Sequence, residues 1–116
     1  MRHSLKSKKL SKPFDQRLAL LKGGVASLIK YGKIKTTVTR AKEIRRMAEK
    51  LVTLAKKGTV SSQREIYKLV PDRDLVKSFV GISSRFAERN GGYTRLTKVG
   101  VRKGDAAPVA LLEFME

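Results

Sequence analysis

Lysine and arginine are the residues whose number and spacing give this sequence a recognisable chemistry. Residues 30–46, KYGKIKTTVTRAKEIRR, contain seven basic residues and one acid, Glu43. A second cluster occupies residues 85–103, and the first twelve residues, MRHSLKSKKLSK, contain five Lys or Arg and no acid. Ammonium groups bind phosphate oxygens as point charges, and guanidinium groups bind them in a bidentate manner. The clusters therefore predict a polyanionic partner.

The candidate nucleic-acid contacts come from these three clusters. The basic candidates are, in chain order, Arg2, Lys6, Lys8, Lys9, Lys12, Lys33, Lys35, Arg40, Lys42, Arg45, Arg46, Arg95, Lys98, Arg102 and Lys103. Thr36, Thr37 and Thr94 have hydroxyl groups suited to phosphate contacts, although the more ordinary role of such β-branched residues is to form strands. Tyr93 either stacks on an exposed base or packs beneath a hairpin. If about ten cations contact phosphates, the log–log slope of affinity against salt is about −7 to −9.

Catalysis lacks the residues it would need. The single histidine, His3, lies in the basic leading segment, and the chain has no cysteine to act as a nucleophile or zinc ligand. No Gly-rich dinucleotide or nucleotide-binding motif occurs, and no set of His and acids has the spacing of a metal site. We therefore expect a protein that is not an enzyme, with no catalytic residue, cofactor, metal or small-molecule substrate.

The excess of basic over acidic residues indicates the kind of partner that this protein binds. The chain of 116 residues has 27 Lys and Arg against 10 Asp and Glu, a net charge of +17. Such an excess repels itself in a folded domain and indicates a negatively charged partner. No apolar run approaches the roughly 18 residues of a membrane span. Residues 1–12 are predicted to form a basic arm that orders on binding, because they have too little apolar area to fold alone.

Hydrophobic periodicity predicts the elements that hold these residues in place. A helix is expected from Pro13 to Tyr31 with Gly32 as a left-handed cap, and its Gly23-Gly24 pair marks a bend or a close approach of another backbone. A short strand is expected over 33–38. A second helix follows over 40–57, with Thr39 as N-cap.

The second half of the chain predicts two more helices and a hairpin. Ser62 and Glu65 have the spacing of a capping box, and Asp72 is placed to cap the fourth helix after Pro71. Residues 93–102 and 108–115 form two β-rich runs joined by a five-residue link. The order helix, strand, three helices, two strands predicts a two-layer α+β domain over 13–116, with helices packed on a small mixed sheet.

Several strings, in this order and spacing, resemble the bacterial large-subunit ribosomal protein seventeen family. They are MRH at the start, KLSK, IKTTVTRAKEIRRMAEKLVTLAKKG, RNGGYTR and GDAAPVALLE. The resemblance covers the whole chain and implies an α+β, non-enzymatic, rRNA-binding protein of the large ribosomal subunit. The RNA contacts that it implies are Arg2, His3, Lys9, Lys12, Arg17, Lys35, Thr36, Thr37, Lys42, Arg45, Arg46, Arg95 and Arg102.

The predicted function is therefore a structural role in the ribosome. The partners expected are large-subunit rRNA and neighbouring ribosomal proteins, with no membrane, and the location expected is the cytoplasmic ribosome. The alternative is a nucleoid-associated DNA-binding protein, which the charge alone permits. Against that alternative, the sequence has neither a helix-turn-helix pattern nor a heptad seam for dimerisation.

Overall fold

The structure, a computed structural model, describes Leu10 and residues 12–115 of the chain. The other residues of the predicted arm lie outside the described part. The elements are, in chain order, α1 (Phe14–Tyr31), β1 (Lys33–Thr37), α2 (Val38–Lys56), α3 (Val60–Leu69), α4 (Arg73–Ser83), the short 3₁₀ helix η1 (Ser84–Phe86), β2 (Thr94–Val101) and β3 (Pro108–Phe114). This order confirms the predicted α+β class.

The sheet has three strands in the order β1-β3-β2, and both pairs are antiparallel. The prediction of a mixed sheet was therefore wrong. The hairpin fixes the direction of β2 against β3, but the long helical segment between β1 and the hairpin allows either direction for β1. The register places Ile34 and Leu96 on either side of Leu112, which is fully buried. These three side chains form the apolar face that packs on the helices.

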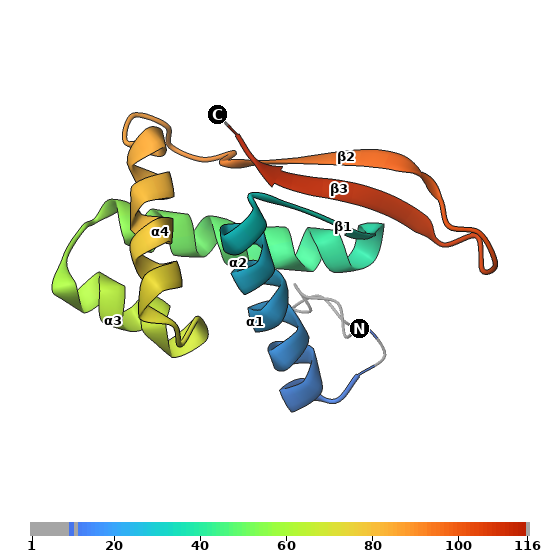
Figure 1. Ribbon diagram of the computed structural model, residues 1–116, viewed down its shortest axis with the longest axis horizontal. Helices are drawn as coiled ribbons and strands as arrows, with labels where there is room; N and C mark the ends of the chain where they lie inside the picture. Colours follow the sequence, from blue (N-terminus) through green and yellow to red (C-terminus); the bar gives the residue numbers. More distant parts are fainter. Residues whose placement is uncertain (1–9, 11, 116) are drawn as a thin grey trace, which may run out of the picture.

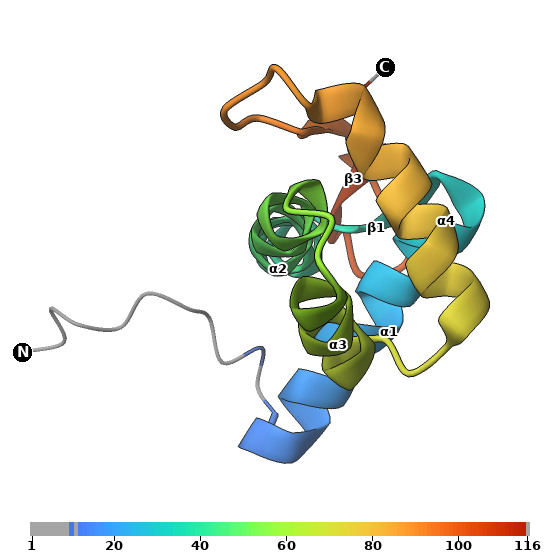
Figure 2. The same ribbon diagram turned by 90° about the vertical axis from the view of Figure 1, so that its left-hand side faces the viewer.

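Helix α2 lies at the centre of the fold. It contacts α1, α3, α4 and all three strands, and the sheet lies above it in Figure 1. Figure 2, which views α2 nearly along its axis, shows α4 at its side and α3 beneath it. The buried apolar residues of α2 are Val38, Ala41, Ile44, Ala48, Leu51, Val52 and Ala55. Their spacing of three or four positions produces one continuous apolar side, as expected for an amphipathic helix.

Two of the predicted helix ends are confirmed. Gly32 follows α1 in the left-handed conformation, with φ 79°, and its N–H donates to the carbonyl oxygen of Leu28. Asp72 caps α4, because its Oδ1 accepts from the backbone N–H groups of Asp74 and Leu75 at 3.0 and 3.3 Å. Both caps satisfy backbone groups that the helix itself leaves without partners.

Two other predicted N-caps were wrong by part of a turn. Helix α2 begins at Val38, directly after β1, so Thr39 lies inside it and Thr37 occupies the cap position. Helix α3 begins at Val60, and Thr59 is its cap: its Oγ1 accepts from the N–H of Ser62 at 3.1 Å. Ser62 is therefore in the first turn, where its own hydroxyl donates to the carbonyl oxygen of Thr59. Short Ser and Thr side chains suit both positions, so the sequence pattern alone did not separate them.

Gly24 allows α1 to approach α2 closely. A Cβ atom built at Gly24 would lie 2.7 Å from Cγ1 of Ile44 on α2, and closer still to its Cδ1. The close neighbour is thus a side chain of α2, whereas we had predicted a bend or another backbone. Gly23 is exposed and has no such neighbour within 4 Å.

The β2–β3 hairpin extends beyond the helices (Figure 1). A bulge leaves Val99 without a partner on β3, because Lys98 pairs with Ala110 and Gly100 with Val109. The turn is closed by a bidentate pair in which Arg102 Nε and Nη2 donate to the two carboxylate oxygens of Asp105 at 3.2 and 2.5 Å. These hydrogen bonds, together with one from the backbone N–H of Ala107, lower the pKa of Asp105 to about 2.

The contact between Gly24 and Ile44 predicts opposite effects for two neighbouring substitutions. Gly23→Ala should stabilise the full chain by up to about 1 kcal/mol, because alanine favours a helix interior over glycine. Gly24→Ala should be less stable than Gly23→Ala by about 1 to 3 kcal/mol, the usual cost of overpacking. Urea denaturation followed by circular dichroism gives both free energies. Ile44→Val removes Cδ1 and should reduce the penalty at Gly24; an unchanged penalty would contradict the contact.

The Arg102–Asp105 pair predicts an unusually acidic carboxyl group. The carboxyl of Asp105 should titrate with a midpoint near pH 2, measured from its carbon resonance by NMR. Because this pKa is lowered in the fold, the contribution of the pair is complete above the ordinary value near 4 and is lost as the pH falls through about 2. In Arg102→Gln the midpoint should rise toward the ordinary value, while Arg95→Gln should leave it unchanged. If the midpoint of Asp105 were the same in Arg102→Gln as in the unchanged protein, this assignment would be refuted.

Candidate nucleic-acid interface

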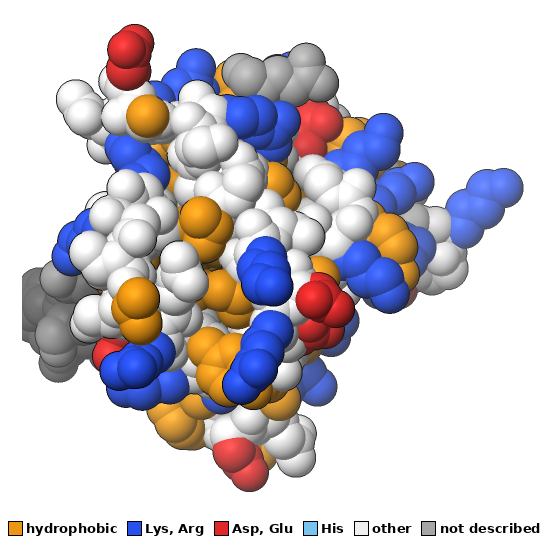
Figure 3. Space-filling view, turned by 60° about the vertical axis from the view of Figure 1, so that its left-hand side comes forward, with side chains coloured by type: hydrophobic (Ala, Val, Ile, Leu, Met, Phe, Trp, Pro, Cys, Tyr) orange, Lys and Arg blue, Asp and Glu red, His pale blue; other side chains and the backbone are white. Residues whose placement is uncertain are grey.

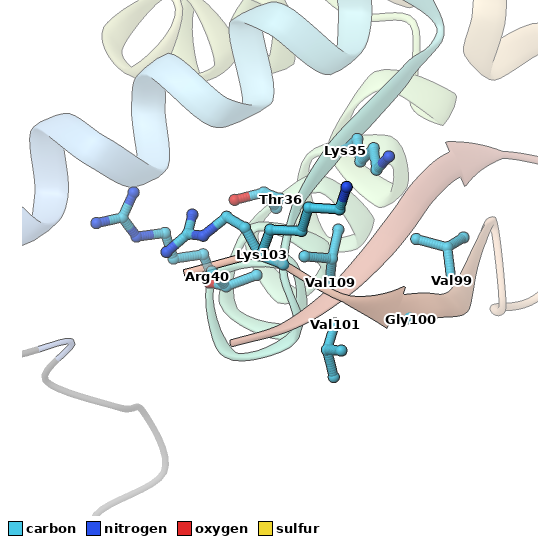
Figure 4. Close-up of a pocket in the computed structure, with 10 residues that line it drawn as sticks. Lys35, Thr36, Arg40, Val99, Gly100, Val101, Lys103 and Val109 are labelled. Carbon is cyan, nitrogen blue, oxygen red and sulfur yellow. The ribbon is translucent and has the colours of Figure 1, made fainter. Parts of the chain in front are cut away.

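A groove forms where β1, the start of α2 and the β2–β3 hairpin meet; we call it the strand–hairpin groove. Its volume is about 580 Å³. It is lined by Lys35, Thr36, Thr37, Arg40, Val99, Gly100, Val101, Arg102, Lys103 and Val109. Six of these residues are candidates from the sequence, and they come from two separate segments of the chain, 35–40 and 102–103. Figure 4 shows the side chains of Lys35, Arg40 and Lys103 around it.

The local fold explains why these residues converge. Strand β1 ends at Thr37 and α2 begins at Val38, so Arg40 follows the strand within one helical turn. The antiparallel register brings Thr37 opposite Val109, and Val109 in turn pairs with Gly100. Arg102 and Lys103 follow β2 at the turn. Residues far apart in sequence are thereby held around a single opening.

The charges around the groove are strongly positive. Lys35, Arg40, Arg102 and Lys103 are exposed, and the lining contains no acid. Arg102 is held by Asp105, but Lys35, Arg40 and Lys103 have no carboxylate within 4 Å among residues 12–115. Thr36 and Thr37 are half-buried and place hydroxyl groups beside these cations. Such a set offers charge and hydrogen-bond donors to phosphate oxygens.

The arginines of α2 are held by carboxylates of the same helix. Arg45 lies 3.7 Å from Glu49 and Arg46 lies 3.5 Å from Glu43, atom to atom. Glu43 is buried, a position that we did not predict for an acid on this basic helix. The sequence did contain a signal for its ion pair: Glu43 and Arg46 are three positions apart, which places their side chains on adjacent turns of the helix. Lys42 on the same helix is exposed and has no such partner among the described residues.

The outer face of the sheet carries further candidates. Lys33 on β1 and Arg95 on β2 lie on either side of Glu113 on β3. Arg95 Nε is 3.9 Å from Glu113 Oε1, and both basic residues are exposed. Lys98 is exposed near the bulge. These residues lie outside the lining of the strand–hairpin groove, so the structure does not gather all the candidates at one point.

Tyr93 and Thr94 are buried and present no free surface to RNA. Tyr93 is 3% exposed, with its ring centroid 5.3 Å from that of Phe86, and its hydroxyl accepts from Lys56 Nζ at 3.2 Å. The hydroxyl of Thr94 donates to Glu49 Oε1 at 3.0 Å. Of the two alternatives for Tyr93, packing beneath the hairpin is therefore the one observed. We had also proposed Thr94 as an RNA contact, and this too does not fit the fold.

The remaining candidates lie near the N-terminus. Arg17 and Lys12 are half-buried, and the guanidinium carbon of Arg17 is 5.5 Å from the centre of the Phe14 ring. The predicted arm contacts outside the described residues are Arg2, His3, Lys6, Lys8 and Lys9.

Other kinds of site find no support in the described part of the chain. Within residues 12–115, no three His, Cys, Asp or Glu side chains gather as metal ligands would. None of the described helices is long and apolar enough to cross a membrane.

Comparison with known proteins identifies the family. The family described as Ribosomal protein L17 matches residues 20–115. A protein named large ribosomal subunit protein bL17 from Dictyoglomus thermophilum is 53% identical over 116 residues, which cover 99% of this chain and all of that protein. Proteins of the same name from Dictyoglomus turgidum and Clostridium tetani are 52% and 50% identical, over 99% and 93% of this chain and 100% and 96% of their own lengths. The chain therefore belongs to the ribosomal protein L17 family.

Proposed function

We propose that this protein binds folded large-subunit rRNA through the strand–hairpin groove, with the basic residues of α2 and of the outer sheet face as additional phosphate contacts. The observation that carries the proposal is the convergence of four cations and two threonines from two distant chain segments, with no acid in the lining. Without a partner, the convergence of these cations lowers the stability of the fold, because like charges repel. Phosphate groups of RNA remove that repulsion and release counterions.

The different settings of the basic residues suggest a division of roles. Arg45, Arg46 and Arg95 are each oriented by a carboxylate, which holds a guanidinium in place before RNA arrives. The lysines of the groove have no such partner among the described residues and adjust to the position of a phosphate. Fixed arginines favour bidentate contacts, whereas adjustable lysines contribute charge at the RNA backbone.

We further propose that the chain works as two parts, a basic arm over residues 1–12 and a domain over 13–116. The arm contains five Lys or Arg and no acid. Such a segment gains order where a polyanion neutralises it. In this role it lies between RNA segments that would otherwise repel each other. Membership of the L17 family argues against the alternative of a nucleoid-associated DNA-binding protein.

The groove can be tested by removing its charges. Combined Lys35→Gln, Arg40→Gln and Lys103→Gln substitutions should weaken binding to full-length large-subunit rRNA. The log–log salt slope should become shallower by about 2 to 3, because each phosphate contact contributes about 0.7 to 0.9. Filter binding at several salt concentrations measures the slope. The matched control, Lys68→Gln, Arg73→Gln and Lys77→Gln, removes the same groups from α3 and α4 and should leave the slope nearly unchanged. Equal effects of the two variants would refute a specific role for the groove.

The arm can be tested separately. A chain lacking residues 2–12 should keep its thermal unfolding midpoint but lose to the intact chain when the two compete for incorporation into large subunits. Quantitative mass spectrometry of subunits from a sucrose gradient gives the ratio. Replacing the five basic arm residues with Gln should reproduce the defect if charge is the cause. Equal incorporation of shortened and intact chains would rule out the arm as a docking element.

A further inference from the structure

A second groove lies between α3 and α4; we call it the α3–α4 groove. Its volume is about 530 Å³. It is lined by Val60, Gln63, Arg64, Tyr67, Lys68, Arg73, Val76 and Lys77. On α3 the lining residues are spaced by three or four positions, which places them along one side of the helix. The proposed contacts with RNA use none of them.

The lining of this groove includes exposed apolar side chains. Val60 is 64% exposed and Tyr67 is 44% exposed, although both are large hydrophobic residues. Val76 of α4 also lines the groove and is almost buried. Val60 and Tyr67 are seven positions apart, so their side chains lie two turns apart on the same side of α3. Exposed apolar side chains that line one groove and are surrounded by polar residues mark interaction surfaces.

The rim of the groove is basic. Arg64, Arg73 and Lys77 have no carboxylate within 4 Å in the described part of the chain. Lys68 is paired with Glu65 at 3.1 Å. The lining itself contains four cations and no acid. Figure 3, which brings the α3 and α4 side of the molecule forward, shows hydrophobic side chains among those of Lys and Arg. A ligand that fits this surface has apolar side chains flanked by negative charges.

The two grooves differ in ways that separate their ligands. Both grooves contain valines, but the strand–hairpin groove has two threonine hydroxyls beside its cations, whereas the lining of the α3–α4 groove has no Ser or Thr and contains an aromatic ring, that of Tyr67. Threonine hydroxyls donate hydrogen bonds to phosphate oxygens, whereas the exposed ring of Tyr67 gains from contact with apolar side chains. In Figure 1, α3 lies at one end of the molecule and the tip of the hairpin at the other. Since the longest extent is 44 Å, both surfaces have room for a ligand at the same time.

We propose that the α3–α4 groove docks an acidic amphipathic helix of a second protein. Apolar side chains of that helix, spaced by three or four positions, pack on Val60, Tyr67 and Val76. Its carboxylates pair with Arg64, Arg73 and Lys77. This is the helix-in-groove mode of recognition, in which the apolar stripe provides affinity and the charged rim provides orientation. The inference does not depend on the groove proposed for rRNA.

Photo-crosslinking in living cells tests the proposal in the assembled particle. Benzoylphenylalanine replaces Tyr67 in one strain and, as a control, Tyr31 in another; Tyr31 is 66% exposed but lies outside the groove. After irradiation, large subunits are isolated and the crosslinked segment is sequenced. We expect position 67, and not position 31, to crosslink to an acidic segment with apolar residues at helical spacing. A crosslink to rRNA, a crosslink to a segment without that pattern, or no crosslink at position 67 would overturn the proposal.

A binding measurement with a defined probe isolates the chemistry. The probe is a fluorescent 16-residue peptide with leucines at helical spacing and glutamates elsewhere, and its fluorescence anisotropy is measured with the full chain. Combined Val60→Ser and Tyr67→Ser should weaken binding about tenfold or more, as expected for central anchors. Tyr31→Ser should have no effect. The proposal fails if a scrambled peptide of the same composition binds equally well. It also fails if the combined Val60→Ser and Tyr67→Ser variant binds the probe normally, because the groove would then not recognise an apolar stripe.

Discussion

The burial of the apolar side of α2 is the constraint on which the rest of the structure depends. The helix contacts α1, α3, α4 and all three strands, so its side chains decide how close each neighbour lies. Its alanines at positions 41, 48 and 55 are almost completely buried. Small side chains at these positions let other elements approach, and the glycine of α1 opposite Ile44 extends the same principle to the partner helix. Because α2 starts directly after β1, its position also fixes where the basic residues of that junction lie.

Among the described residues, four of the ten acids of the chain lie beside arginines. Glu43, Glu49, Glu113 and Asp105 each lie within 4 Å of an arginine side chain. Exposed pairs of this kind contribute little to stability. Their physical effect is to restrict rotamers, since an arginine held by a carboxylate loses less freedom when it later binds phosphate. Glu49 also accepts the hydroxyl of Thr94, so one carboxylate links α2 to the hairpin.

The shape of the molecule separates its surfaces. The hairpin, stiffened at its tip by the Arg102–Asp105 pair, extends from one end, and α3 lies at the other (Figure 1). Cations occur at both ends and both grooves contain valines, but the other neighbours differ: threonine hydroxyls at the strand–hairpin junction, and an aromatic ring between α3 and α4. A single net charge of +17 therefore describes two chemically distinct surfaces. The hydroxyl groups or the aromatic ring beside the cations, rather than the charge itself, distinguish the partners that each surface suits.

The sequence by itself determined the class of elements, their order and the family. Periodic apolar residues, Gly32 and Asp72 set the helices because these are local effects of backbone geometry and capping. The direction of β1, the burial of Glu43 and Tyr93 and the tight contact at Gly24 were decided only by tertiary structure. Each depends on a residue distant in sequence. The same holds for the groove: charge density along the chain identified Lys35, Arg40 and Lys103 one by one, but antiparallel pairing of β1 with β3 brought them around one opening.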